Sequence, residues 1–118
     1  MLARELRVKK RQDFDSVYKK GKSYSCKYLK VYVLSTDLPI QRFGFSISKK
    51  VSKRAVDRNK LKRQISFIIR EELHSLKSNI DLVFVLRSSI LDLPFAEMKS
   101  NINNLLEKAN LYKQVTKT

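Results

Sequence analysis

The sequence KKVSKRAVDRNKLKR, residues 49–63, is the stretch from which the fold and function of this chain are best inferred. It holds eight basic residues and one acidic residue, so about an eighth of the 118 residues carries +7 of the formal net charge of +15. The strand-like segment Phe43–Ser48 ends just before it, and a helix-like segment begins within it at Arg58. Most charge runs are solvated surfaces, but this position between two amphipathic elements favours a fixed binding surface.

The segment from Arg58 onward has the periodicity of an amphipathic helix. Its apolar positions recur every three or four residues: Leu61, Ile65, Ile68, Ile69, Leu73 and Leu76. At about 100° per residue, the opposite arc consists of Asn59, Lys60, Arg63, Ser66 and Arg70. Arg58 and Lys62 lie nearer the apolar arc, at its N-terminal end, where they can project past the core. Two residues fit neither arc, namely Glu72 on the apolar side and Phe67 on the polar side.

Alternating side chains predict two strands before the basic stretch. In residues 27–35 the two faces are Leu29, Val31 and Val33 against Tyr28, Lys30 and Tyr32. In the second strand they are Phe43, Phe45 and Ile47 against Gly44, Ser46 and Ser48. The Tyr–Lys–Tyr face offers rings for base stacking and an ammonium group for phosphate, and the small residues predict a shallow trough beside it if the registers match. The connection over residues 35–42, with Asp37 and Pro39, predicts a hairpin.

The N-terminal part predicts a basic arm over residues 1–12, followed by a short helix from about Asp13 that ends at Gly21. Lys22–Cys26 can add a further strand to the sheet. The closest acidic pair here, Asp13 and Asp15, has the character of residues in a helix first turn rather than of metal ligands.

The C-terminal part predicts one strand and one helix. The apolar run Ile80–Arg87 indicates a strand buried on both faces. A helix begins near Pro94 with an apolar stripe of Met98, Ile102, Leu105, Leu106 and Ala109, and residues 113–118 are expected to fray. The whole order, α-β-β-(β)-α-β-α, predicts a single α+β domain over residues 1–118, a two-layer α/β sandwich with some sheet surface left open.

A net charge of +15 makes polyanions the expected partners. Nucleic acids fit best, and no membrane is expected, because no apolar run approaches about twenty residues and the basic residues are spread over several elements. The free protein should also bind anions such as sulfate or phosphate and gain structure from them. The single cysteine, Cys26, suits a reducing compartment, and the basic N-terminus lacks the apolar segment of a secretory signal, so a cytoplasmic location is expected.

The sequence offers few groups for catalysis. His74 is the only histidine, and the eleven acidic residues are scattered, so neither a metal site nor an acid–base pair is indicated. There is no phosphate-binding loop and no nucleophile motif. We therefore expect a binding protein without catalytic residues or a cofactor of its own. An aromatic–basic strand face beside a basic helix suits single-stranded or irregular RNA better than a duplex major groove.

The sequence FGFSISKKV (residues 43–51), followed by RNKLKR (residues 58–63), resembles the signature of the bacterial ribonuclease P protein subunit. In that family a strand of the form G-x-S-x-S-K-K leads to a helix that opens R-N-R-x-K-R. The first helix, the strand Tyr28–Leu34, the run Ile80–Arg87 and the closing Asn110–Lys113 also fit, so the resemblance covers nearly the whole chain. Two features depart from it: Lys60 lacks the bidentate fork of an arginine, and Ser52-Lys53-Arg54 replaces a turn that often contains glycine.

The resemblance implies the fold αβββαβα with a left-handed βαβ crossover, of the ribosomal protein S5 domain 2 type, although right-handed crossovers are the general expectation. It also implies an accessory subunit of ribonuclease P. The RNA of that enzyme, with magnesium, catalyses endonucleolytic removal of the 5′ leader from precursor tRNA, and the protein binds the ribonuclease P RNA subunit and the precursor tRNA. The alternative is a ribosomal or assembly protein that uses a similar fold to bind structured RNA, and a protein-only nuclease comes third.

The resemblance assigns two sets of residues. The first would contact the catalytic RNA: Lys53, Arg58, Asn59, Lys60, Lys62 and Arg63. The second would line a cleft for the leader, between the first helix and the sheet: Phe14, Tyr18, Lys30, Tyr32, Ser46 and Lys50. This cleft coincides with the aromatic–basic strand face and the small-residue trough, so two separate arguments lead to the same place.

Overall fold

The computed structural model describes residues 2–113, and its element order confirms the predicted αβββαβα arrangement. The main elements are α1 (Arg11–Lys20), β1 (Lys22–Ser25), β2 (Leu29–Ser35), β3 (Arg42–Ser46), α2 (Ala55–Glu72), β4 (Ile80–Leu86) and α3 (Phe95–Lys108). Short 3₁₀ helices occupy Arg4–Leu6, Leu73–Ser75 and Ser88–Asp92. Of the C-terminal residues expected to fray, 114–118 lie outside the described range.

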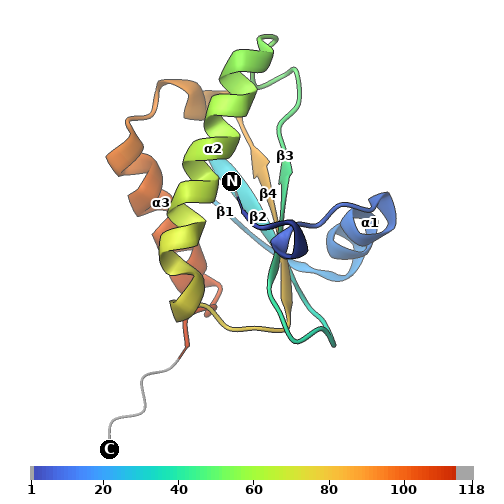
Figure 1. Ribbon diagram of the computed structural model, residues 1–118. Coiled ribbons are helices and arrows are strands. Elements are labelled where there is room, and N and C mark those ends of the chain that lie inside the picture. The colour runs from blue at the N-terminus through green and yellow to red at the C-terminus, as the bar shows by residue number, and fades with distance from the viewer. Residues whose placement is uncertain (1, 114–118) are drawn as a thin grey trace, which may run out of the picture.

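The four strands form one sheet in the order β1-β2-β4-β3. The central strand β4 pairs antiparallel with β2 and parallel with β3, so the predicted hairpin between β2 and β3 is wrong. β4 takes the central place because it is apolar on both faces, and all its residues except Val85 are buried. In Figure 1 helix α2 lies in front of the sheet and the chain returns from it to β4 on the left of β3, which makes the β3-α2-β4 crossover left-handed.

The sheet separates two apolar clusters of unequal size. Helices α2 and α3 cover one face, whereas α1 covers part of the other (Figure 1). The main core on the α2 and α3 side includes Leu29, Val31, Phe43, Leu82, Phe84, Ile65, Ile68, Ile69, Met98, Ile102 and Leu106. A smaller group on the α1 side consists of Val8, Val17 and Val83. Because α1 is short, it leaves part of the second sheet face for a ligand.

The end of α1 shows why a glycine is needed at residue 21. Gly21 caps the helix through its N–H, which donates to the carbonyl of Val17 at 2.9 Å, and its φ of −76° is not the left-handed conformation that is common for a glycine at a helix end. A Cβ at residue 21 would instead meet the carbonyl oxygens of Val17 and, at 2.8 Å, Val33. Glycine is therefore required here by the close approach of α1 to β2.

Helix α2 begins at Ala55, three residues before the predicted start at Arg58. Its buried residues include Ser66, which is only 1% exposed, so the prediction that Ser66 lies on the polar arc is wrong. Ser66 borders the apolar arc, one turn from Ile69, and the packed face is wider than the apolar residues alone indicate. Burial raises the pKa of the Tyr112 phenol to about 12, and the negative charge of the nearby Glu72 contributes to this shift.

The segment before α1, which was predicted as a basic arm, is attached to the edge of the sheet. Leu2 and Val8 are buried, and Arg7 forms a parallel bridge with Phe43 at the outer edge of β3. The N–H of Val8 donates to the carbonyl of Phe43 at 2.9 Å. The two apolar residues bind the segment to the sheet edge, which fixes the basic residues between them next to α1.

Candidate nucleic-acid interface

The strand register arranges side chains in rows across the α1 side of the sheet. One row contains Tyr32, Val83 and Gly44, and the next contains Lys30, Val85 and Ser46. The aromatic–basic residues of β2 and the small residues of β3 therefore share one face, as predicted, but β4 lies between them. Tyr28 does not belong to this face: it precedes β2 and packs against the main core, so that part of the prediction is wrong.

Aromatic side chains of α1 cover the first row. The rings of Tyr18 and Tyr32 meet edge to face with centroids 5.0 Å apart, and Phe14 lies 6.4 Å from Tyr18. A Cβ at Gly44 would lie 2.7 Å from Cε1 of Phe14. Phe14 thus fills the predicted trough at Gly44. The glycine serves the packing of α1 onto β3.

An open groove of about 390 Å³ remains between α1 and the end of β3. Its lining combines aromatic rings, two positive charges, one carboxylate and two hydroxyl groups: Lys9, Arg11, Phe14, Asp15, Tyr18, Phe45 and Ser46. Three of the six predicted cleft residues line it, and Tyr32 contacts one of them, Tyr18. Lys9 and Arg11 were not singled out from the sequence, although the charge of residues 1–12 was the available signal.

The other two predicted cleft residues lie beside the groove rather than in it. Lys30 Nζ is 4.8 Å from the ring centroid of Tyr32, a cation–π contact in the row next to the groove. Lys50 is exposed in the turn after β3. Lys9 has a pKa below the usual value of a lysine, because desolvation and the charges of Arg4 and Arg7 disfavour its ammonium form. A bound phosphate would relieve this repulsion.

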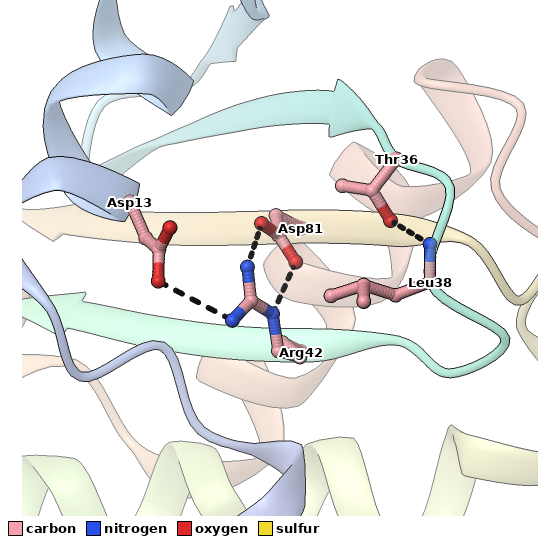
Figure 2. A network of polar contacts seen from close by, with 5 residues as sticks. All are labelled: Asp13, Thr36, Leu38, Arg42 and Asp81. Carbon is pink, nitrogen blue, oxygen red and sulfur yellow. Dashed lines mark hydrogen bonds and ion pairs between the residues drawn. The ribbon is translucent and has the colours of Figure 1, made fainter.

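A network of three charged residues fixes α1 to the sheet (Figure 2). Arg42 on β3 donates to both carboxylate oxygens of Asp81 on β4, from Nε at 2.9 Å and from Nη2 at 2.6 Å. Its Nη1 donates to Asp13 in the first turn of α1 at 3.3 Å. The bond to Asp81, which is 3% exposed, raises the pKa of Arg42. The network connects two strands and α1, so it positions the rings of Phe14 and Tyr18.

The turn before α2 replaces the glycine-containing turn of the family with hydrogen bonds from one serine. Ser52 Oγ accepts from the N–H of Arg54 at 3.2 Å and donates to Asp57 at 2.9 Å. Arg58 Nη1 donates to the carbonyl of Ser52 at 2.8 Å. Part of the guanidinium of Arg58 therefore holds the turn together, and Arg58 is half-buried.

The predicted RNA-contact residues are otherwise arranged along the outer side of α2 and its preceding turn. Lys53, Asn59, Lys60 and Arg63 are exposed, and Lys62, like Arg58, is half-buried. This agrees with the helical arcs, which placed Arg58 and Lys62 nearer the core. The structure thus brings the set into one basic surface, which we call the α2 surface, and separates it by the sheet from the groove beside α1 (Figure 1).

Within residues 2–113 no group of three His, Cys, Asp or Glu residues is placed to hold a metal ion. No helix in that range is long and apolar enough to cross a membrane. The fold and the two surfaces define a small basic α+β protein with a cationic groove on one side of its sheet and a cationic helix on the other.

Comparison with known proteins identifies the family. The ribonuclease P family model matches residues 2–110. A ribonuclease P protein component from Clostridium botulinum is 43% identical over 110 residues, covering 92% of this chain and 98% of its own length, and one from Clostridioides difficile is 38% identical over 105 residues, covering 88% and 91%. The chain belongs to the ribonuclease P protein family, whose members are a component of the enzyme that processes tRNA 5′ ends.

Solved structures agree with this assignment. The RNase P protein of Staphylococcus aureus superposes with a TM-score of 0.85 at 28% identity, covering 92% of this chain and 98% of that one. The protein from Thermotoga maritima gives a TM-score of 0.79 at 27% identity, covering 86% and 96%. The fold and the family that the motif resemblance implied are thus confirmed, whereas the RNA contacts of individual residues stay predictions.

Proposed function

We propose that this protein holds the ribonuclease P RNA and the precursor tRNA together. The α2 surface binds the catalytic RNA, the groove beside α1 binds the 5′ leader, and the RNA performs the hydrolysis with magnesium, in the cytoplasm. The observation that carries the proposal is the placement of two basic surfaces on opposite sides of one sheet. A protein built in this way can contact two RNA strands at once.

The groove is suited to a single strand. Rings of Phe14 and Tyr18 stand beside the cationic side chains of Lys9 and Arg11 in one cavity of about 390 Å³. Bases stack on aromatic rings without much sequence preference, while cations follow the phosphates. A leader differs in sequence from one precursor tRNA to another, so a sequence-tolerant site is what this substrate requires.

The α2 surface is suited to folded RNA instead. Its exposed residues are mainly basic and long, and α2 commits its apolar face to the core, so it cannot enter a groove as an isolated helix. Phosphate contacts of this kind position a partner and depend on salt. The turn at residues 48–54 connects β3, at the edge of the groove, to the start of α2. It carries Lys53 of the α2 surface and three further basic residues, Lys49, Lys50 and Arg54.

The proposal is tested by cleavage of a precursor tRNA with a clostridial ribonuclease P RNA at low magnesium, with and without this protein. We expect cleavage to be faster with the protein, because it adds binding energy for the leader. An unchanged rate would overturn the proposal, and cleavage by the protein in the absence of the RNA would show a protein nuclease instead.

The free protein should gain stability from anions. With a net charge of +15, the folded state collects basic groups that bound sulfate or phosphate neutralises, and ligands that bind only the folded state raise its stability. We expect circular dichroism to show an increase in helix signal, a higher melting temperature, or both, on adding sulfate at low ionic strength. A matched concentration of chloride is the control, and equal effects of the two salts would argue against specific anion sites.

A further inference from the structure

Phe67 is an aromatic residue that the core of the protein does not use. It lies on the polar side of α2 and is 52% exposed. One neighbouring ring, Phe95 at the start of α3, meets it edge to face, with centroids 6.0 Å apart and planes at 87°. Phe95 itself packs against the core, so it holds Phe67 in place while a large part of the Phe67 ring faces solvent.

Basic residues precede Phe67 along α2, and the acidic residue that follows it is in an ion pair. Arg63 and Lys60 lie one and two turns before Phe67, respectively, on the same side of α2, and both are exposed. Glu71 lies one turn after Phe67 and forms an ion pair with Lys99 of α3 at 3.5 Å, which offsets its negative charge. The ring therefore stands at the C-terminal end of the α2 surface, with basic side chains leading up to it.

We propose that Phe67 stacks on an unpaired nucleobase of the ribonuclease P RNA, while Lys60 and Arg63 contact the flanking phosphates. This inference rests on the proposed role of the α2 surface and extends that surface by about one helical turn beyond Arg63, where the family signature ends. A half-exposed ring next to two cations is the arrangement that proteins use for unpaired bases. It gives the α2 surface a contact that phosphate binding alone does not supply.

A second copy of the chain fits this patch less well. A symmetric dimer through Phe67 would bring Lys60 and Arg63 of one copy against the same residues of the other, because each side of such an interface presents the same patch. Juxtaposed like charges oppose association, and the net charge of +15 adds to the repulsion. An RNA base brings negative phosphates with it and removes the repulsion instead.

The test compares Phe67→Leu and Phe67→Tyr in binding to a clostridial ribonuclease P RNA across a series of salt concentrations. Phe67→Leu keeps an apolar side chain but removes the ring, and we expect it to weaken binding roughly tenfold, within the range for one base–ring stack. The slope of affinity against salt should stay unchanged, because no phosphate contact is lost. Phe67→Tyr retains the ring and should bind within about twofold of the wild type.

Controls separate stacking from general effects. Leu38→Ala removes another exposed apolar residue, 39% exposed in the loop after β2 and away from α2, and should leave RNA binding unchanged. Thermal unfolding of each variant checks that the ring is not needed for folding. Equal affinity of Phe67→Leu and the wild type would overturn the inference, as would sedimentation showing a dimer that Phe67→Leu abolishes without any change in RNA affinity. Failure of the wild type itself to bind the RNA would overturn the proposed function instead.

Discussion

The groove beside α1 and the α2 surface are both basic, but they are built in different ways. In and around the groove, the predicted cleft residues contact one another and the sheet: Tyr18 meets Tyr32, Phe14 covers Gly44, and Lys30 lies over Tyr32. On the α2 surface, Lys53, Asn59, Lys60 and Arg63 extend from an already stable helix into solvent. The groove is therefore part of a packed structure, whereas the α2 surface is a set of separate exposed side chains.

This difference determines how each region responds to substitution. A change in the groove moves its neighbours, so stability and leader binding are lost together. A change on the α2 surface removes one contact and leaves the fold intact, because exposed side chains contribute little to stability. The predictions below test this distinction at sites where it is sharpest.

The largest effect is expected for Arg42→Ala. This variant leaves Asp81 charged and buried without its partner, which costs about 3–5 kcal/mol of unfolding free energy. α1 also loses its contact through Asp13, so leader affinity should fall as well. Urea unfolding measures the first effect, and the difference in affinity between precursor and mature tRNA measures the second.

A double variant separates two effects of Arg42: its neutralisation of the buried charge of Asp81, and its bond to Asp13 of α1. Arg42→Met together with Asp81→Leu removes both buried charges and keeps apolar volume, so it should recover much of the stability lost in Arg42→Ala. The leader affinity should stay low, because Asp13 still lacks its partner on β3. Full recovery of leader affinity would show that the network does not position α1.

A smaller effect is expected for Gly44→Ala. The added methyl group would lie 2.7 Å from Phe14 and 3.2 Å from Cβ of Val8, so α1 has to shift, at a cost of about 1–3 kcal/mol in unfolding free energy. Ser46→Ala on the same strand and face introduces no such contact and is the matched control for the unfolding free energy. We expect Gly44→Ala to reduce leader affinity through the displaced Phe14. Equal behaviour of the two variants would contradict the packed character of the groove.

Tyr32→Ala is expected to weaken the binding of precursor tRNA, relative to mature tRNA, by about 1–1.5 kcal/mol. This lies in the lower part of the range for one base–ring stack, because part of the Tyr32 ring is already used by Tyr18. Tyr32→Phe keeps the ring and should bind nearly as the wild type does. Equal losses for precursor and mature tRNA would mean that the residue supports the fold but not the leader.

The same distinction explains which features could be predicted from the sequence. The exposed face of α2 was predicted almost residue by residue, because helical periodicity is local and the arc opposite an apolar stripe is exposed by geometry. Ser66 was the exception, since a border position is decided by what packs beside it. The buried character of β4 was also readable, because an unbroken apolar run suits a strand covered on both faces.

The groove depended on information that no local pattern contains. Alternation correctly placed Lys30 and Tyr32 on one face of β2, and Gly44 and Ser46 on one face of β3. It could not show that β4 separates these strands, which is a matter of long-range pairing and overturned the predicted hairpin. Nor could it show that Arg42 and Asp81 form the ion pair that holds α1, since the partners are far apart in the chain.

The smallest effect on the fold is expected for Arg63→Gln, which tests the α2 surface directly. Arg63 is exposed, so the unfolding free energy should change by less than about 0.5 kcal/mol. Its loss should lower the dependence of log affinity on log salt by roughly 0.7–0.9 for the catalytic RNA, the contribution of one phosphate contact. Precursor and mature tRNA should be affected equally, since the proposed leader groove lies on the other side of the sheet. A selective loss for the precursor would place the leader on α2, and the two surfaces would then no longer have separate roles.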